Sequence, residues 1–157
     1  RMTGGRAGPP REPFPDQASA AAPAAYAATA ESWDLAVHAA IAAVFEFLAE
    51  RPAQTKACIV FDGGAGPVAL ARRDQVLERF ASLLEPGFAA AVTPPPPVVA
   101  EAIVGGIYEL VRNHVLERRL DLLREAIPDA TVVALSPFVG PASAIRLASA
   151  KSVQASR

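Results

Sequence analysis

The fold of this chain is decided by residues 98–115, which read VVAEAIVGGIYELVRNHV. Placed on a helix, the large apolar side chains of this stretch cover an arc of about 180°, whereas an ordinary surface helix shows an apolar stripe of about 100°. The stretch therefore predicts a helix over residues 98–119 that is buried on two sides. One side can face the chain's own core, and we expect a second copy of the chain to cover the other. The arc is made by Val99, Ile103, Val104, Ile107, Tyr108, Leu110, Val111 and Val115.

Upstream, the strongest helical pattern runs over residues 32–50. Ser32 is a favourable N-cap, and Pro52 ends the pattern. The large apolar residues recur at helical spacing within an arc of about 80°, which is typical of a helix that packs one face inward. These residues are Trp33, Val37, Ile41, Val44 and Leu48.

Two further helices are predicted between these two patterns. Residues 53–61 predict a short helix, and residues 68–85 predict an amphipathic one. The glycine-rich residues 62–67 predict the loop that joins them, and the prolines of residues 94–97 predict an extended linker. The loop lacks the Lys and the Ser or Thr that follow the glycines of a P-loop, so no nucleotide site is expected there.

The last helical pattern covers residues 129–150. Pro137, Gly140 and Pro141 interrupt it, so we expect this region to kink or split. No segment alternates with the two-residue period of a strand. The sequence therefore predicts an all-α fold of about five to six helices.

The two ends of the chain differ from this helical body. Residues 1–16 are rich in proline and glycine and hold few large aliphatic side chains, so they predict a disordered arm. Residues 18–30 are rich in alanine and predict a weak helix rather than a secretory signal. We expect one domain over residues 17–150 and a disordered tail over residues 151–157.

Composition and charge narrow the class of protein. Apolar residues make up 52% of the chain and alanine carries much of this share, which favours helices. The 15 Lys and Arg nearly balance the 16 Asp and Glu, so no chain-wide positive field favours nucleic acid. No apolar run reaches the length of a membrane span, and a single cysteine cannot form an internal disulfide. These features predict a cytoplasmic protein that needs no membrane.

No pattern of titratable residues predicts catalysis. His38 and His114 are the two imidazoles, and neither lies in a motif with a nucleophile. Cys58 is expected to act as a small buried hydrophobe, and no Cys or His spacing suggests zinc. We therefore expect no enzyme activity, no cofactor and no metal. The histidines are open to two interpretations, as packed side chains or as polar groups of a pocket or an interface.

The order of segments over residues 31–148 resembles the C-terminal half of a TetR-family transcriptional regulator. The first helix opens with Trp33 and ends with the run FLAERP of residues 47–52. The resemblance is clearest in AEAIVGGI at residues 100–107 and in SPFVG at residues 136–140. The resemblance also includes two turns, Gly66-Pro67 and Pro86-Gly87.

The resemblance implies a sensor domain whose middle helices enclose a small-molecule pocket. It implies a hydrophobic or amphipathic effector that controls DNA binding by the intact regulator, acting as a repressor. Ordinary core packing is the alternative interpretation of the same apolar residues. The implied pocket residues are Val37, Ile41, Val44, Phe61, Phe80, Leu84, Ile107, Tyr108 and Val111.

The resemblance also implies a homodimer, in which the last two long helices pair with those of a second subunit as a four-helix bundle. The Gly105-Gly106 pair would allow close approach of another helix. Glu109 and Arg112 are open to a second interpretation, as solvated charges. The implied interface residues are Gly105, Glu109, Arg112, Phe138, Val139 and Ile145.

The chain departs from that family at its start. Regulators of this kind carry a helix-turn-helix of roughly fifty residues ahead of the sensor domain. Only the arm and the alanine-rich stretch precede Ser32 here, so DNA binding is expected only through a helix-turn-helix that is missing from this chain. Two other classes stay open: a stand-alone helical domain for dimerisation or partner binding with a filled core, and a small helical enzyme.

Overall fold

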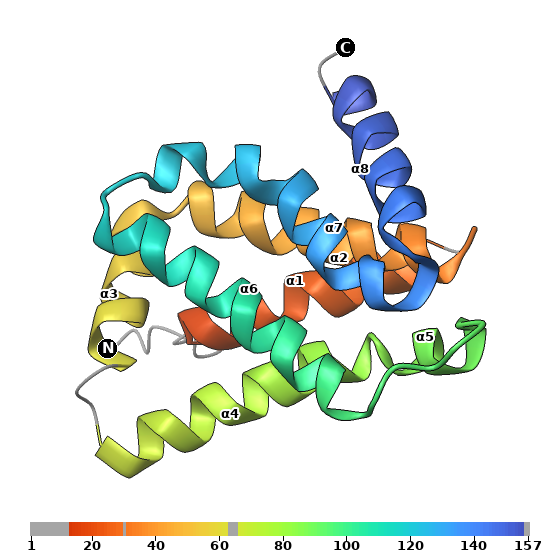
Figure 1. Cartoon of the computed structure of the whole chain (residues 1–157). Coiled ribbons are helices and arrows are strands. Elements are labelled where there is room, and N and C mark those ends of the chain that lie inside the picture. The colour runs from red at the N-terminus through yellow and green to blue at the C-terminus, as the bar shows by residue number, and fades with distance from the viewer. Residues whose placement is uncertain (1–12, 30, 63–65, 156–157) are drawn as a thin grey trace, which may run out of the picture.

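The computed structural model describes the backbone of residues 13–29, 31–62 and 66–155. In these ranges the chain is helical and contains no strand, so the predicted all-α class is confirmed (Figure 1). The helices, in chain order, are α1 (Phe14–Ala28), α2 (Trp33–Ala49), α3 (Pro52–Asp62), α4 (Gly66–Ser82), α5 (Glu85–Ala90), α6 (Val98–Leu116), the 3-10 helix η1 (Leu120–Ala126), α7 (Ile127–Val139) and α8 (Pro141–Ala155).

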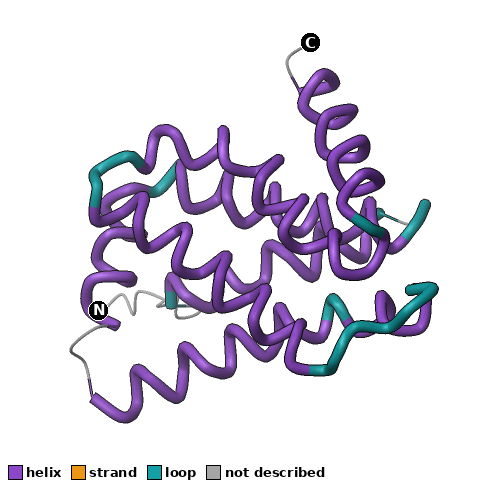
Figure 2. The backbone as a smooth tube through the Cα atoms, viewed as in Figure 1, coloured by secondary structure: helices purple, strands orange, loops and turns teal. Residues whose placement is uncertain are grey.

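The described residues hold more helices than the five to six that the sequence predicts. The short helices α5 and η1, of six and seven residues, are too short to show a helical period over several turns. The region after residue 126 is split at Gly140 into α7 and α8, as its interruptions suggest, while Pro137 lies inside α7. Among the described residues, the linker between α5 and α6 is the longest non-helical segment (Figure 2).

The predicted ends of the domain need correction. The helix α1 begins at Phe14 and has Pro15 in its first turn. Proline is tolerated there, because the backbone N–H groups of the first turn have no partner within the helix. Residues 14–16 therefore belong to the domain, Pro13 is the N-cap of α1, and residues 1–12 of the expected arm lie outside the described residues. At the other end α8 runs to Ala155, so most of the expected tail, residues 151–155, is helical.

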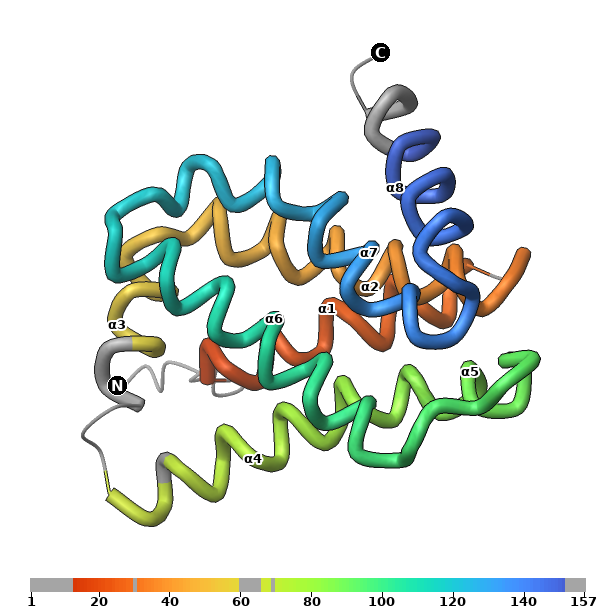
Figure 3. Tube along the Cα trace, viewed as in Figure 1, coloured from red at the N-terminus to blue at the C-terminus, as the bar shows by residue number. Residues whose placement is uncertain are grey.

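The helix α2 lies at the centre of the fold. It contacts α1 on one side and both α7 and η1 on the other. The helix α4 packs against α6 and α1, so α1 contacts both α2, the next helix in the chain, and the more distant α4 (Figure 3). The helix α8 packs against α7 and then points away from the body (Figure 1).

The helix α6 is buried on two sides, as its apolar arc predicts. The partner on the second side differs from the expected one. The helix contacts α4 as well as α7, η1 and α3, all from the same chain. Its most buried residues are Ala100, Ile103, Val104, Val111 and Val115. The expectation that a second copy covers this arc is therefore wrong, because α4 already does so.

An aromatic cluster joins α2, α5 and α7. The rings of Trp33 and Phe138 meet edge to face at 5.2 Å between centroids, and those of Phe88 and Phe138 at 5.0 Å. Gly87 is buried beside them. A Cβ atom at this position would lie 2.4 Å from the Trp33 ring, so only glycine leaves room for the contact.

Candidate functional site

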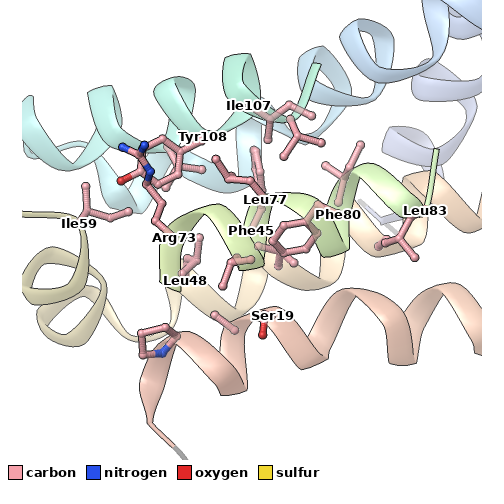
Figure 4. Close-up of a pocket in the computed structure, with 18 of the residues that line it drawn as sticks. Ser19, Phe45, Leu48, Ile59, Arg73, Leu77, Phe80, Leu83, Ile107 and Tyr108 are labelled. Atoms are coloured by element: carbon pink, nitrogen blue, oxygen red, sulfur yellow. The ribbon is translucent and has the colours of Figure 1, made fainter. Parts of the chain in front are cut away.

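The helices α1, α2, α4 and α6 surround a cavity of about 170 Å³, with α3 at one end (Figure 4). The side chains of Phe45, Leu77 and Phe80 lie along its length. The wall is almost wholly aliphatic and aromatic. From α2 it includes Val37, Ala40, Ile41, Val44, Phe45 and Leu48, from α6 Ile103, Val104, Ile107, Tyr108 and Val111, and from α4 and the turn after it Val76, Leu77, Phe80, Leu83 and Leu84.

The structure brings together eight of the nine pocket residues that the resemblance implies. Val37, Ile41, Val44, Phe80, Leu84, Ile107, Tyr108 and Val111 all line this one cavity. The ninth, Phe61, lies outside the residues whose side chains the structure describes. These positions come from α2, from α4 and the turn after it, and from α6, so they share a wall only because the fold brings them together.

The helix α1 supplies a part of the wall that the sequence does not predict. Phe14, Pro15, Ala18 and Ser19 line the cavity from this helix. Its most buried residues are Ser19 and Ala22, which are too small to give a strong apolar pattern. The spacing of Phe14 and Ala18, four residues apart on one face, is the signal that could have indicated it.

Two hydroxyl groups of the wall bind the chain's own backbone. The Oγ1 of Thr55 donates to the carbonyl oxygen of Leu48 at 2.9 Å, and Thr55 is fully buried. The Oγ of Ser19 donates to the carbonyl oxygen of Asp16 at 3.0 Å. These bonds fix α3 against α2 and stabilise the start of α1, so both hydroxyl protons are used within the fold.

Two arginines form the charged part of the wall. Arg72 Nη2 lies 3.1 Å from Asp16 Oδ2, which links α4 to α1. Arg73 Nη2 lies 3.2 Å from Asp74 Oδ1, and its guanidinium carbon lies 5.8 Å from the ring centroid of Tyr108. Figure 4 shows Arg73 and Tyr108 side by side near Ile59, at the α3 end of the pocket. The cavity is therefore apolar along its length and cationic at this end.

The polar group of Trp33 has a partner in the protein. Its Nε1–H donates to the carbonyl oxygen of Leu83 at 2.9 Å. A ligand is therefore not needed to satisfy this buried indole. Trp33 belongs to the aromatic cluster and not to the wall of the cavity.

The two histidines do not line the cavity. His38 Nδ1 lies 2.9 Å from Thr131 Oγ1, and this buried hydroxyl donates to the carbonyl oxygen of Ile127 at 2.8 Å. Burial lowers the pKa of His38 below its usual value, and the nearby charge of Lys151 lowers it further. His114 Nδ1 lies 2.8 Å from the carbonyl oxygen of Leu110. Each ring therefore has a hydrogen-bond partner within the fold, as a packed side chain does.

The predicted interface residues do not form one group. Phe138 is 6% exposed and packs within its own chain, so its assignment to an interface is wrong. Glu109 and Arg112 are exposed and pair with each other at 3.3 Å. The remaining three lie at or near the surface: Gly105 and Val139 are partly exposed, and Ile145 is 52% exposed.

Comparison of the chain with protein families, with curated proteins and with solved structures found no match. Within the described ranges, no helix has both the length and the apolar character that crossing a membrane requires. Over the same residues, no group of three or more His, Cys, Asp or Glu side chains gathers as metal ligands would.

Proposed function

We propose that this chain is the effector-binding and dimerisation domain of a TetR-like transcriptional regulator. In this proposal the cavity holds a small hydrophobic or amphipathic molecule. The chain acts in the cytoplasm, and the intact protein reads DNA through a helix-turn-helix outside the described domain. The observation that carries the proposal is the cavity between α1, α2, α4 and α6, because a domain with a filled core would not contain it.

The proposed signal is a shift between conformations and not a reaction. A ligand shifts such an equilibrium only by its difference in affinity for the two states. The cavity is bounded by α4 and α6, and α4 contacts the rest of the fold through α6, α1 and α3. Filling the cavity would therefore favour one position of α4 against α6. A movement of this kind could change the spacing of two DNA-binding units across a dimer.

A thermal-shift screen with small apolar compounds tests the proposal. A compound that binds the folded state alone stabilises it by about 2.7 kcal/mol at a concentration of a hundred times its dissociation constant. For a chain of this size that corresponds to a rise in melting temperature of several degrees. We expect at least one compound of about the size of benzene or slightly larger to produce this rise, because a cavity of roughly 150 Å³ holds benzene.

A variant that fills the cavity provides the control. Ala40 is buried and lines the wall, so Ala40→Leu should abolish the rise in melting temperature. Ala102 is exposed on α6 and does not line the wall, so Ala102→Leu should leave the rise unchanged. A screen in which no compound stabilises the protein would favour the alternative, a stand-alone helical dimerisation or partner-binding domain.

A further inference from the structure

We infer that the ligand is an amphipathic anion, and that Arg73 binds its carboxylate while the apolar tail fills the cavity. This inference rests on the proposed function, since it specifies the chemistry of the ligand for the same site.

The charged side chains in the wall of the cavity are all positive. Among the described residues that line the cavity, Arg72 and Arg73 are charged and none is acidic. Asp16 pairs with Arg72 and links α4 to α1. The partner of Arg73 is Asp74, the next residue, whose side chain is 59% exposed. An exposed pair of this kind contributes little, so Arg73 keeps most of its capacity to bind another anion.

Arg73 also holds a hydrogen-bond donor that the fold does not use. Its Nε atom is buried and has no acceptor among the described residues. The side chain as a whole is 35% exposed, so this end of the cavity meets the surface. A guanidinium group carries five N–H donors in a planar fork that matches a carboxylate. Arg73 therefore lies in the wall of the cavity with a donor that no group in the described part of the fold accepts, as binding of an acidic group with an apolar tail would need.

Tyr108 helps to orient this guanidinium. Its ring lies beside Arg73 at the same end of the cavity, at a distance that allows a cation–π contact (Figure 4). A single arginine offers about one positive charge, which matches a carboxylate better than a phosphate, with its charge of about −1.5 to −2.

The test compares octanoate with 1-octanol, which carries a tail of the same length without the charge. Isothermal titration calorimetry on the wild-type chain measures both affinities. A wholly apolar site would prefer the alcohol, because moving a carboxylate out of water is costly. We expect the opposite order, with octanoate bound about tenfold or more tightly than octanol.

The variant Arg73→Met keeps the length and the apolar stem of the side chain and removes its charge. It should weaken octanoate binding by about 10- to 100-fold and leave octanol binding unchanged, which also shows that the cavity is intact. Arg112 lies on the exposed face of α6 and does not line the cavity, so Arg112→Met should bind both ligands like the wild type.

The possible outcomes separate this inference from the proposed function. If octanol binds at least as tightly as octanoate, the inference is wrong while the proposal of an apolar effector stands. If Arg73→Met binds octanoate as the wild type does, Arg73 is not the anion site and the inference is wrong. If neither ligand binds the wild type and the compound screen is also negative, both fail. If Arg73→Met does not fold, the comparison of octanoate and octanol affinities on the wild-type chain tests the inference by itself.

Discussion

At the scale of single residues, Gly87 sets the packing of the aromatic cluster. A Cβ atom there would lie 2.4 Å from the Trp33 ring and 2.9 Å from the Phe138 ring. The Trp33 ring cannot easily move away, because its Nε1–H is bound to the Leu83 carbonyl oxygen. We expect Gly87→Ala to lower the free energy of unfolding by about 1–3 kcal/mol, as overpacked cores do. Urea denaturation measures the change.

Gly105 offers the matched control for this substitution. It lies inside α6, and a Cβ atom there would meet nothing within 4 Å. Gly105→Ala should therefore raise the free energy of unfolding by about 0.5–1 kcal/mol, because alanine is the better helix former. Equal effects of the two substitutions would contradict the packing that we describe around Trp33.

His38 makes the stability of the fold depend on pH. Burial, and then the charge of Lys151, lowers its pKa below the usual value of 6.5. Below about pH 6.5 the unfolded chain therefore binds a proton that the folded chain does not yet bind. The free energy of unfolding should fall as the pH drops from 6.5 through the folded pKa. Above pH 6.5 His38 is neutral in both states and contributes no slope.

The variant His38→Gln isolates this contribution, because it removes the titrating group and keeps an amide for the hydrogen bond with Thr131. Denaturation in a pH series that spans 6.5 measures the slope for both proteins. The variant should lose less stability than the wild type toward acid pH. Parallel curves for the two proteins would show that His38 does not carry the effect.

At the scale of elements, Gly140 sets the break between α7 and α8. Its backbone angles are φ 82° and ψ 151°, a region that side chains with a Cβ rarely adopt. Gly140→Ala should lower the free energy of unfolding by about 1–3 kcal/mol through backbone strain. Denaturation measures it, with Gly106→Ala in α6 as the control, because a Cβ atom there also meets nothing within 4 Å. If Gly140→Ala is as stable as the wild type, the break does not depend on glycine.

Pro137 shows why a proline within a helical pattern need not end the helix. Proline removes one backbone donor, and the acceptor four residues earlier is the carbonyl of Val133. Both residues lie on the exposed side of α7, where water can satisfy that carbonyl. The sequence could therefore indicate an interruption between residues 137 and 141 but not its position, which depends on what surrounds each residue.

Most helices of the fold could be predicted from the sequence, because their apolar residues recur at helical spacing. Ser32 correctly marks the start of α2, and the wide arc correctly marks α6 as a helix with two partners. The identity of those partners could not be read from the pattern. An apolar helix face indicates that another segment packs against it, but it does not identify that segment. The pattern of α6 therefore cannot distinguish α4 from a second copy of the chain.

The candidate site was predictable in its apolar part alone. The resemblance implies eight positions that line the cavity, six of them on α2 and α6 and two on α4 and the turn after it. Arg73 gave no signal, because a charged residue on an amphipathic helix usually faces solvent. Its place in the wall depends on where α4 meets α6 and α3, which is a property of the tertiary structure.

At the scale of the whole molecule, the surface of α7 and α8 bears on the proposed dimer. Val133 on α7 is 50% exposed and Ile145 on α8 is 52% exposed. Together, α7 and α8 form the last helical region, which the proposed bundle would pair, along with α6, with a second subunit. We therefore expect sedimentation velocity to show a dimer at micromolar concentration.

The double variant Val133→Glu with Ile145→Glu should convert that dimer to a monomer. Burying a Val or Ile side chain contributes about 1.5–3 kcal/mol, and an unpaired carboxylate in its place opposes contact. Two such sites in each subunit should raise the dissociation constant by a factor of about 100 or more. Val92, fully exposed in the linker before α6, provides the control, and Val92→Glu should remain dimeric. A wild-type chain that sediments as a monomer would remove the dimer from the proposal and leave the cavity as its remaining support.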